Sequence, residues 1–160
     1  MLVIIELILS SLVHSKAWLN RPLTSLNIAD EYWPVPPSYT NATWFEDYRQ
    51  EFKTAVAFDW QPYLYWNTKP FSGKYINVNE ARARKTWSPP LKIAGTQDKK
   101  KKIFMFGGST MWGWGARDTY TIPSLVNRRL FEGYGINAEI TNFGEIGFVS
   151  TQEVLRLIFE

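Results

Sequence analysis

The chain contains no cysteine and only one histidine, His14. The absence of cysteine excludes disulfide bonds and thiolate metal sites, although it fits either side of a membrane. The single histidine restricts the possible catalytic mechanisms, because imidazole is the commonest general base near neutral pH. The net charge is also small, since 18 Lys and Arg against 15 Asp and Glu leave a formal excess of +3. So small an excess does not argue for a nucleic-acid partner.

Apolar and aromatic side chains are plentiful by contrast. Hydrophobic residues make up 45% of the 160 residues and charged residues 21%, which is typical of a globular protein. The eight Trp, eight Tyr and ten Phe are unusually many for this length. The length itself is that of one ordinary domain.

An apolar stretch runs from Leu2 to Val13 at the start of the chain. It is too short for a membrane span, which needs ~20 residues, but it fits the apolar part of a signal peptide. A stretch rich in proline, from Asn20 to about Pro37, then resembles an extended tether. We therefore expect residues 1–19 to be a signal peptide or membrane anchor, and the protein to lie at the cell envelope. A buried N-terminal helix is the alternative.

Residues 20–98 form an aromatic-rich region and linker. The spacing from Trp44 to Phe58 predicts a helix, and the alternation from Tyr75 to Asn79 predicts a strand whose turn spans 71–74. Several aromatic side chains could form a sugar-stacking platform or pack this region against the domain that follows. We expect packing, because aromatic residues dominate cores more often than they line sites. The residues concerned are Trp60, Tyr63, Tyr65, Trp66 and Trp87.

The most informative stretch is Lys102 to Thr110, which reads Lys-Ile-Phe-Met-Phe-Gly-Gly-Ser-Thr. Its apolar part, 103–106, is too short for a helix and has no polar face, which predicts a buried parallel strand. Gly107 and Gly108 allow a sharp turn and a close approach of the backbone. Ser109 then lies at the carboxyl end of the strand, where open α/β sheets place their ligands. The four lysines from Lys99 are interpreted as a solvated connector before this strand.

A second strand and turn follow at Ala138 to Phe143 and at Asn142-Phe143-Gly144-Glu145-Ile146-Gly147. Between the two blocks, 111–115 reads as a flexible loop, and Thr121 is expected to cap a helix that glycines 133 and 135 end. Ser150 to Glu153 predicts a capping box for the last helix. In a right-handed βαβ unit the two strands are parallel and their loops emerge together. Ser109 and Gly147 would then be neighbours, with backbone N–H groups able to point at one oxygen.

These two blocks resemble the first two blocks of the SGNH (GDSL-type) hydrolases, over about Lys102 to Glu160. The resemblance implies a three-layer α/β/α, flavodoxin-like parallel sheet, of which residues 99–160 would be the first βαβα portion. It implies that Ser109 is the nucleophile and that the N–H groups of Ser109 and Gly147 form part of the oxyanion hole. It implies no metal or organic cofactor. Gly108 departs from the family, because many members carry Asp there. The supporting residues would be Gly107, Gly108, Thr110, Asn142 and Gly144.

By this resemblance the protein is a serine esterase or acyltransferase. Its substrate would be an ester-bearing small molecule, glycan or lipid, with no nucleic-acid partner. The family supplies its Asn and its Asp-x-x-His in later blocks, and neither block occurs after Gly147. We therefore expect the 160-residue chain to be incomplete, and inactive by itself. The alternative is a non-catalytic, membrane-tethered glycan-binding or assembly protein of the same fold.

Other readings of these residues remain open at this point. The Gly-Gly-Ser turn could be only a tight strand–helix connection. A phosphate-binding loop has glycines spaced as at 108 and 113, but Trp114 stands where its lysine is required. Gly113 and Gly115 have the spacing of the first two glycines of a dinucleotide-binding fingerprint, but Asp118 stands where its last glycine is required. Asn142 could hold the second turn rather than contact substrate. Arg117 and Asp118 are expected to form a local surface pair.

Overall fold

The computed structural model describes residues 36–90 and 101–160. The chain divides into two compact units, Met1–Ala42 and Thr43–Glu160. The described part of the first unit carries the short 3-10 helix η2 (Pro37–Tyr39). The predicted signal or anchor, His14 and most of the proline-rich tether lie outside the described residues. No helix within 36–90 or 101–160 is long and apolar enough to cross a membrane.

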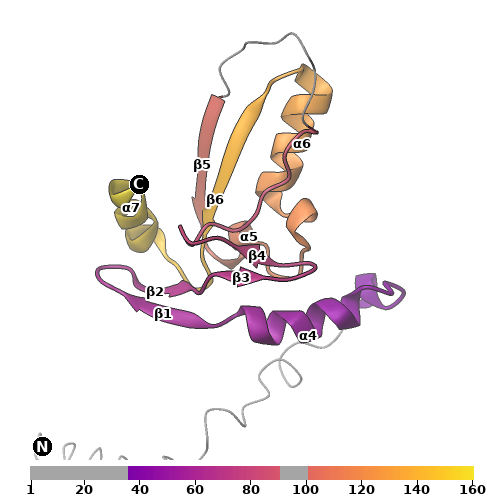
Figure 1. Ribbon diagram of the computed structural model, residues 1–160, viewed down its shortest axis with the longest axis horizontal. Helices are drawn as coiled ribbons and strands as arrows, with labels where there is room; N and C mark the ends of the chain where they lie inside the picture. The colour runs from indigo at the N-terminus through magenta and orange to yellow at the C-terminus, as the bar shows by residue number, and fades with distance from the viewer. Residues whose placement is uncertain (1–35, 91–100) are drawn as a thin grey trace, which may run out of the picture. The chain divides into compact units, whose positions relative to one another are not determined.

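A parallel pair of strands organises the second unit (Figure 1). Strand β5 (Lys101–Gly107) pairs with β6 (Ala138–Gly144), and Gly107 lies opposite Gly144. Helix α6 (Ile122–Tyr134) packs against β6 and α7 (Ser150–Phe159) against β5, on opposite sides of the pair in Figure 1. The unit is therefore mixed α/β with a parallel pair, which confirms the fold class at this level.

The predicted strand at 103–106 is less buried than expected. Phe104 is 45% exposed, and every residue of β5 is either exposed or half-buried. Within the described residues, β5 pairs with a strand on one edge only, the edge toward β6. Its other edge has no strand beside it. The parallel direction was predicted correctly and the burial was not.

The helix signals in the sequence are largely confirmed. Thr121 Oγ1 accepts a hydrogen bond from Ser124 N at 3.4 Å and caps α6, whose last residue is followed by Gly135 at φ 65°. The capping box of α7 is displaced by one residue, because Val149 precedes the helix and its N–H donates to Gln152 Oε1 at 3.0 Å. Ser150 is therefore the first residue of the helix rather than its cap.

Between residues 43 and 90 the aromatic-rich region folds as one helix and two hairpins. Helix α4 (Phe45–Ala55) is followed by the antiparallel strands β1 (Phe58–Gln61) and β2 (Tyr65–Thr68), which form the first hairpin. The second hairpin pairs β3 (Phe71–Ser72) with β4 (Asn77–Val78). The predicted strand at 75–79 is therefore shorter than expected, and part of its predicted turn is the partner strand.

One residue of this region joins the parallel pair. Arg84 forms bridges with Val78 of β4 and with Asn142 of β6, and its N–H donates to the Asn142 carbonyl at 3.0 Å. Two parallel strands alone would leave both edges of the pair without a partner. At β6 the chain before β5 covers this edge at Asn142.

Candidate active site

Ser109 lies where β5 meets a short helix, α5 (Ser109–Trp112). The loop predicted at 111–115 is therefore helical in its first part, and Trp112 is only 1% exposed. Glycine is required where α5 crosses the strand ends. A Cβ on Gly107 would lie 2.6 Å from Met111 Cβ, and one on Gly144 would lie 2.4 Å from Trp112 N. The two glycines thus let the helix that carries Ser109 sit directly on both strands.

Gly108 has no such requirement. Its backbone is extended, with φ −80° and ψ −154°, which any residue can adopt. A Cβ there would lie 3.3 Å from the Phe148 carbonyl, which calls for only a small adjustment.

Ser109 and Gly147 line the same cavity, whose volume is about 620 Å³. Within the described residues, Ser109 Oγ makes no hydrogen bond, and the N–H groups of Ser109 and Gly147 donate none. These three groups are thus available to a bound molecule. Thr110 also lines the cavity, whereas Gly107, Gly108, Asn142 and Gly144 do not. The remaining lining residues are Gly113, Trp114, Ala116, Tyr120, Thr121, Ile122 and Ile146.

Asn142 serves the second turn rather than the cavity. Its side chain is buried, its Oδ1 accepts from Gly144 N at 2.9 Å, and its Nδ2 donates to the Met111 carbonyl at 3.0 Å. These bonds join the end of β6 to the helix that carries Ser109. The arrangement agrees with the reading in which Asn142 holds the turn.

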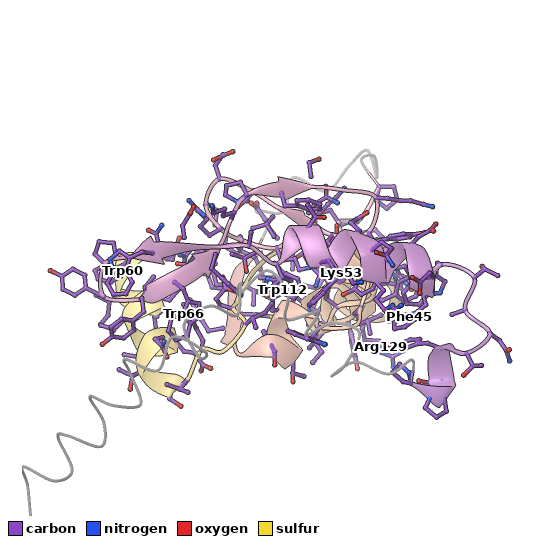
Figure 2. The ribbon with its side chains drawn as sticks, turned by 90° about the horizontal axis from the view of Figure 1, so that it is seen from below. Phe45, Lys53, Trp60, Trp66, Trp112 and Arg129 are labelled. Carbon is purple, nitrogen blue, oxygen red and sulfur yellow. The ribbon has the colours of Figure 1, made fainter. Side chains whose placement is uncertain are left out.

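The aromatic side chains divide between two environments, and packing was expected for all of them. Trp60, Tyr63 and Tyr65 are 68%, 70% and 51% exposed, so the expectation is wrong for Trp60 and Tyr65, whereas the exposed Tyr63 still contacts Phe159 of α7. Figure 2 shows Trp60 at the far end of its hairpin and Trp112 beneath α4. Trp66 is half-buried instead, and its Nε1 donates to the Ile146 carbonyl at 2.9 Å. The hairpin therefore contacts the second turn through Trp66.

A buried ion pair lies beneath the loop that follows Ser109. Arg84 Nε donates to Asp118 Oδ1 at 3.1 Å, and the exposed fractions of the two side chains are 0% and 8%. The expected pair of Arg117 with Asp118 is wrong, because the Arg117 guanidinium stacks on Trp44 and Tyr120. Sequence reasoning missed Arg84, since nothing in the basic stretch 80–85 marks one arginine as buried.

Arg84 also satisfies the backbone of that loop. Its Nη1 donates to the carbonyls of Trp112 and Gly113 at 3.0 and 2.8 Å, and its Nη2 to that of Ala116 at 2.6 Å. Buried carbonyls without partners are costly, so this one side chain fixes the course of the loop. Because Gly113 and Ala116 line the cavity, Arg84 determines the shape of one of its walls.

The titration of Asp118 should leave a signature in the pH dependence of stability. Burial raises the pKa of this carboxyl above its ordinary value of 3.8, and the Arg84 guanidinium and Asn77 donors offset only part of that effect. The folded protein then binds the proton more tightly than the unfolded chain. The contribution of Asp118 to the free energy of unfolding should therefore fall as the pH rises from 3.8 through the raised value.

Urea unfolding of the wild type and of Asp118→Asn, between about pH 4 and about pH 7, measures this term. Other carboxyl groups titrate in both proteins, so the difference between the two isolates Asp118. The wild type should lose stability relative to the variant as the pH rises. A difference that stays constant, or that changes in the opposite direction, would contradict the raised pKa.

Comparison with known proteins adds no assignment to this geometry. A scan against protein-family models gives no match, and neither does a search of curated proteins.

Proposed function

We propose that this protein is an SGNH-type serine acyl hydrolase or acyltransferase, and that Ser109 is its nucleophile. One observation carries the proposal: Ser109 and Gly147 follow the ends of two adjacent parallel strands and line one cavity. The residue types fit, because acyl transfer needs a hydroxyl beside backbone N–H donors. The proposed substrates are ester-linked acyl groups of a glycan or lipid at the cell envelope.

The proposed chemistry begins with Ser109. Its Oγ attacks the ester carbonyl while a base takes the hydroxyl proton, and the carbonyl oxygen becomes an oxyanion. The N–H groups of Ser109 and Gly147 donate to that oxygen. Collapse of the intermediate expels the alcohol and leaves an acyl-serine. Water then releases the acid, or a second alcohol accepts the acyl group.

We place the base for this reaction outside the described residues. Those residues include no histidine, and none of them hydrogen-bonds Ser109 Oγ. Carboxyl groups, with ordinary pKa values near ~4, are weak bases for a hydroxyl. The experiment that tests the proposal is therefore an assay of the protein at its natural length. Turnover of short-chain aryl esters that depends on Ser109 would support it.

A second candidate function is glycan binding without turnover. The observation that favours it is the exposed pair Trp60 and Tyr65, whose ring centroids lie 5.5 Å apart on the first hairpin. Aromatic faces of this kind suit sugar rings, and exposed aromatic clusters often mark binding surfaces. In this case the natural-length protein would bind a glycan equally well with Ser109 or with alanine, and neither form would hydrolyse an ester.

Gly147→Ala should reduce turnover by roughly 10²–10³, the usual cost of one lost oxyanion donor. The backbone of Gly147 has φ +79°, a conformation that alanine adopts at a cost of roughly 1–2 kcal/mol. Space is not the obstacle, because the added Cβ would lie 3.4 Å from Trp66 Cζ2. The turn should therefore shift and carry the N–H away from the oxyanion. The measurement is kcat and KM, beside the thermal unfolding temperature.

Gly135→Ala is the matched control for this variant. Gly135 has φ +65°, has no heavy atom within 4 Å of an added Cβ, and follows α6 outside the cavity lining. It should show the same kind of strain with normal turnover. Equal stability losses in the two variants with normal activity in both would refute the oxyanion role of Gly147.

A further inference from the structure

The turn that carries Gly147 contains a buried carboxylate to which the chemistry above gives no role. Glu145 is only 1% exposed and lies two residues before Gly147. Its Oε2 accepts from Thr68 N at 2.7 Å and from Asn67 Nδ2 at 3.2 Å. Its Oε1 accepts from Thr68 Oγ1 at 2.6 Å and from Ile146 N at 2.8 Å. Three of these four bonds reach the first hairpin, across more than seventy positions of sequence.

The four partners suit a carboxylate, because every one of them is able to donate. Burying such a group is unfavourable unless its lone pairs are satisfied. Here they are satisfied only while the hairpin and the turn stay in this relative position. The main-chain N–H of Glu145 adds a bond of 2.9 Å to the Gly107 carbonyl, at the end of the strand that leads to Ser109. Glu145 thus links the hairpin, the second turn and the first block.

A second contact acts on the peptide group of Gly147 itself. Trp66 Nε1 donates to the Ile146 carbonyl at 2.9 Å. That carbonyl and the Gly147 N–H belong to the same peptide unit, which is planar and trans. In a trans peptide the C=O and N–H groups point in opposite directions, so a bond that holds the carbonyl also directs the N–H. The hairpin therefore sets the orientation of the Gly147 N–H without contacting it.

We infer that the first hairpin aims the Gly147 oxyanion donor, and that Glu145 and Trp66 are the positioning residues through which it does so. The inference rests on the proposed function, because the aim of this N–H affects turnover only if it meets an oxyanion. Neither side chain has to touch the reacting atoms. Glu145 holds the turn to the hairpin, and Trp66 fixes the peptide plane.

The test uses Trp66→Phe and Glu145→Gln in the natural-length protein. The first change removes the indole N–H together with the five-membered part of the ring system, and it keeps a phenyl ring against the turn. The second keeps the shape of the side chain but places an amide NH₂ against groups that are themselves donors. Each variant should lower kcat by roughly tenfold to a hundredfold. This decrease should not exceed the decrease caused by removing a whole oxyanion donor. KM should change by less than about threefold, because the donor acts mainly in the transition state.

Glu51→Gln is the matched control for Glu145→Gln. Glu51 also accepts several hydrogen bonds, from the N–H groups of Lys74, Tyr75 and Ile76, and it joins α4 to the second hairpin. It does not line the cavity that contains Ser109. The Glu51→Gln variant should be less stable than the wild type, without a selective decrease in kcat. A merely structural Glu145 would behave in the same way.

A readout independent of turnover follows the contacts themselves. Amide exchange at Thr68 or at Ile146 should accelerate in Glu145→Gln, because these N–H groups bond different carboxylate oxygens and glutamine replaces one of the two by NH₂. Faster exchange together with a lower kcat supports the inference. Faster exchange with kcat unchanged in both variants overturns it, as does unchanged exchange in a folded variant. Turnover that survives Ser109→Ala would instead remove the proposed function and this inference together, and that result is recognised without either positioning variant.

Discussion

Replacing Ser109 by alanine should abolish ester turnover in the natural-length protein while leaving its fold intact. Loss of a nucleophile in a base-assisted site typically costs on the order of 10⁶ in rate, because neither the acyl-enzyme nor its oxyanion can form. The fold should survive, since Ser109 Oγ makes no hydrogen bond within the described residues. Alanine is also well tolerated within a helix. The measurement is kcat/KM on a short-chain aryl ester, with circular dichroism to verify folding.

Ser150→Ala is the matched control for Ser109→Ala. Ser150 is the first residue of α7, as Ser109 is of α5, and it does not line the cavity. The control should keep full activity. If purified Ser109→Ala also kept it, another residue would have to be the nucleophile, and the assignment to the SGNH type would lose its central residue.

The sequence predicted the features that depend on neighbours along the chain. Strands β5 and β6, the Thr121 cap and the glycine after α6 all follow from local patterns, because each depends on residues within about one turn or one strand. The proximity of Ser109 and Gly147 on one cavity followed from the expected βαβ unit, because the carboxyl ends of its two adjacent parallel strands meet at the same edge of the sheet.

The contacts that join residues 43–90 to the two blocks with Ser109 and Gly147 could not be predicted in the same way. Arg84 pairs with Asp118 over 34 positions, and Glu145 bonds to Thr68 over 77. A charged residue is normally exposed, so composition favours the wrong environment for both. The aromatic residues were ambiguous for another reason. Tyr65 is exposed and Trp66 half-buried although they are neighbours in β2, and the boundaries of so short a strand were not evident beforehand.

Arg84→Met should destabilise the second unit by about 3–5 kcal/mol, the usual cost of breaking a buried ion pair on one side. Methionine replaces the aliphatic stem of the side chain and removes every guanidinium donor. Asp118 would then remain buried without its cation, and the carbonyls of Trp112, Gly113 and Ala116 would lose their partner. Urea unfolding near pH 7 measures the loss. Arg82→Met is the control, because Arg82 pairs with a partly exposed Asp59, and exposed pairs contribute little to stability.

A double-mutant cycle with Asp118→Asn separates the charge from the carbonyl contacts. Without Arg84, the pKa of Asp118 should rise further, because the nearby positive charge that lowers it is gone. Adding Asp118→Asn to Arg84→Met should therefore restore part of the lost stability, since the uncompensated charge is removed with its partner. The orphaned carbonyls would keep the double variant less stable than the wild type. Strict additivity of the two changes would show that the pair is not coupled, and that Arg84 acts through the loop carbonyls alone.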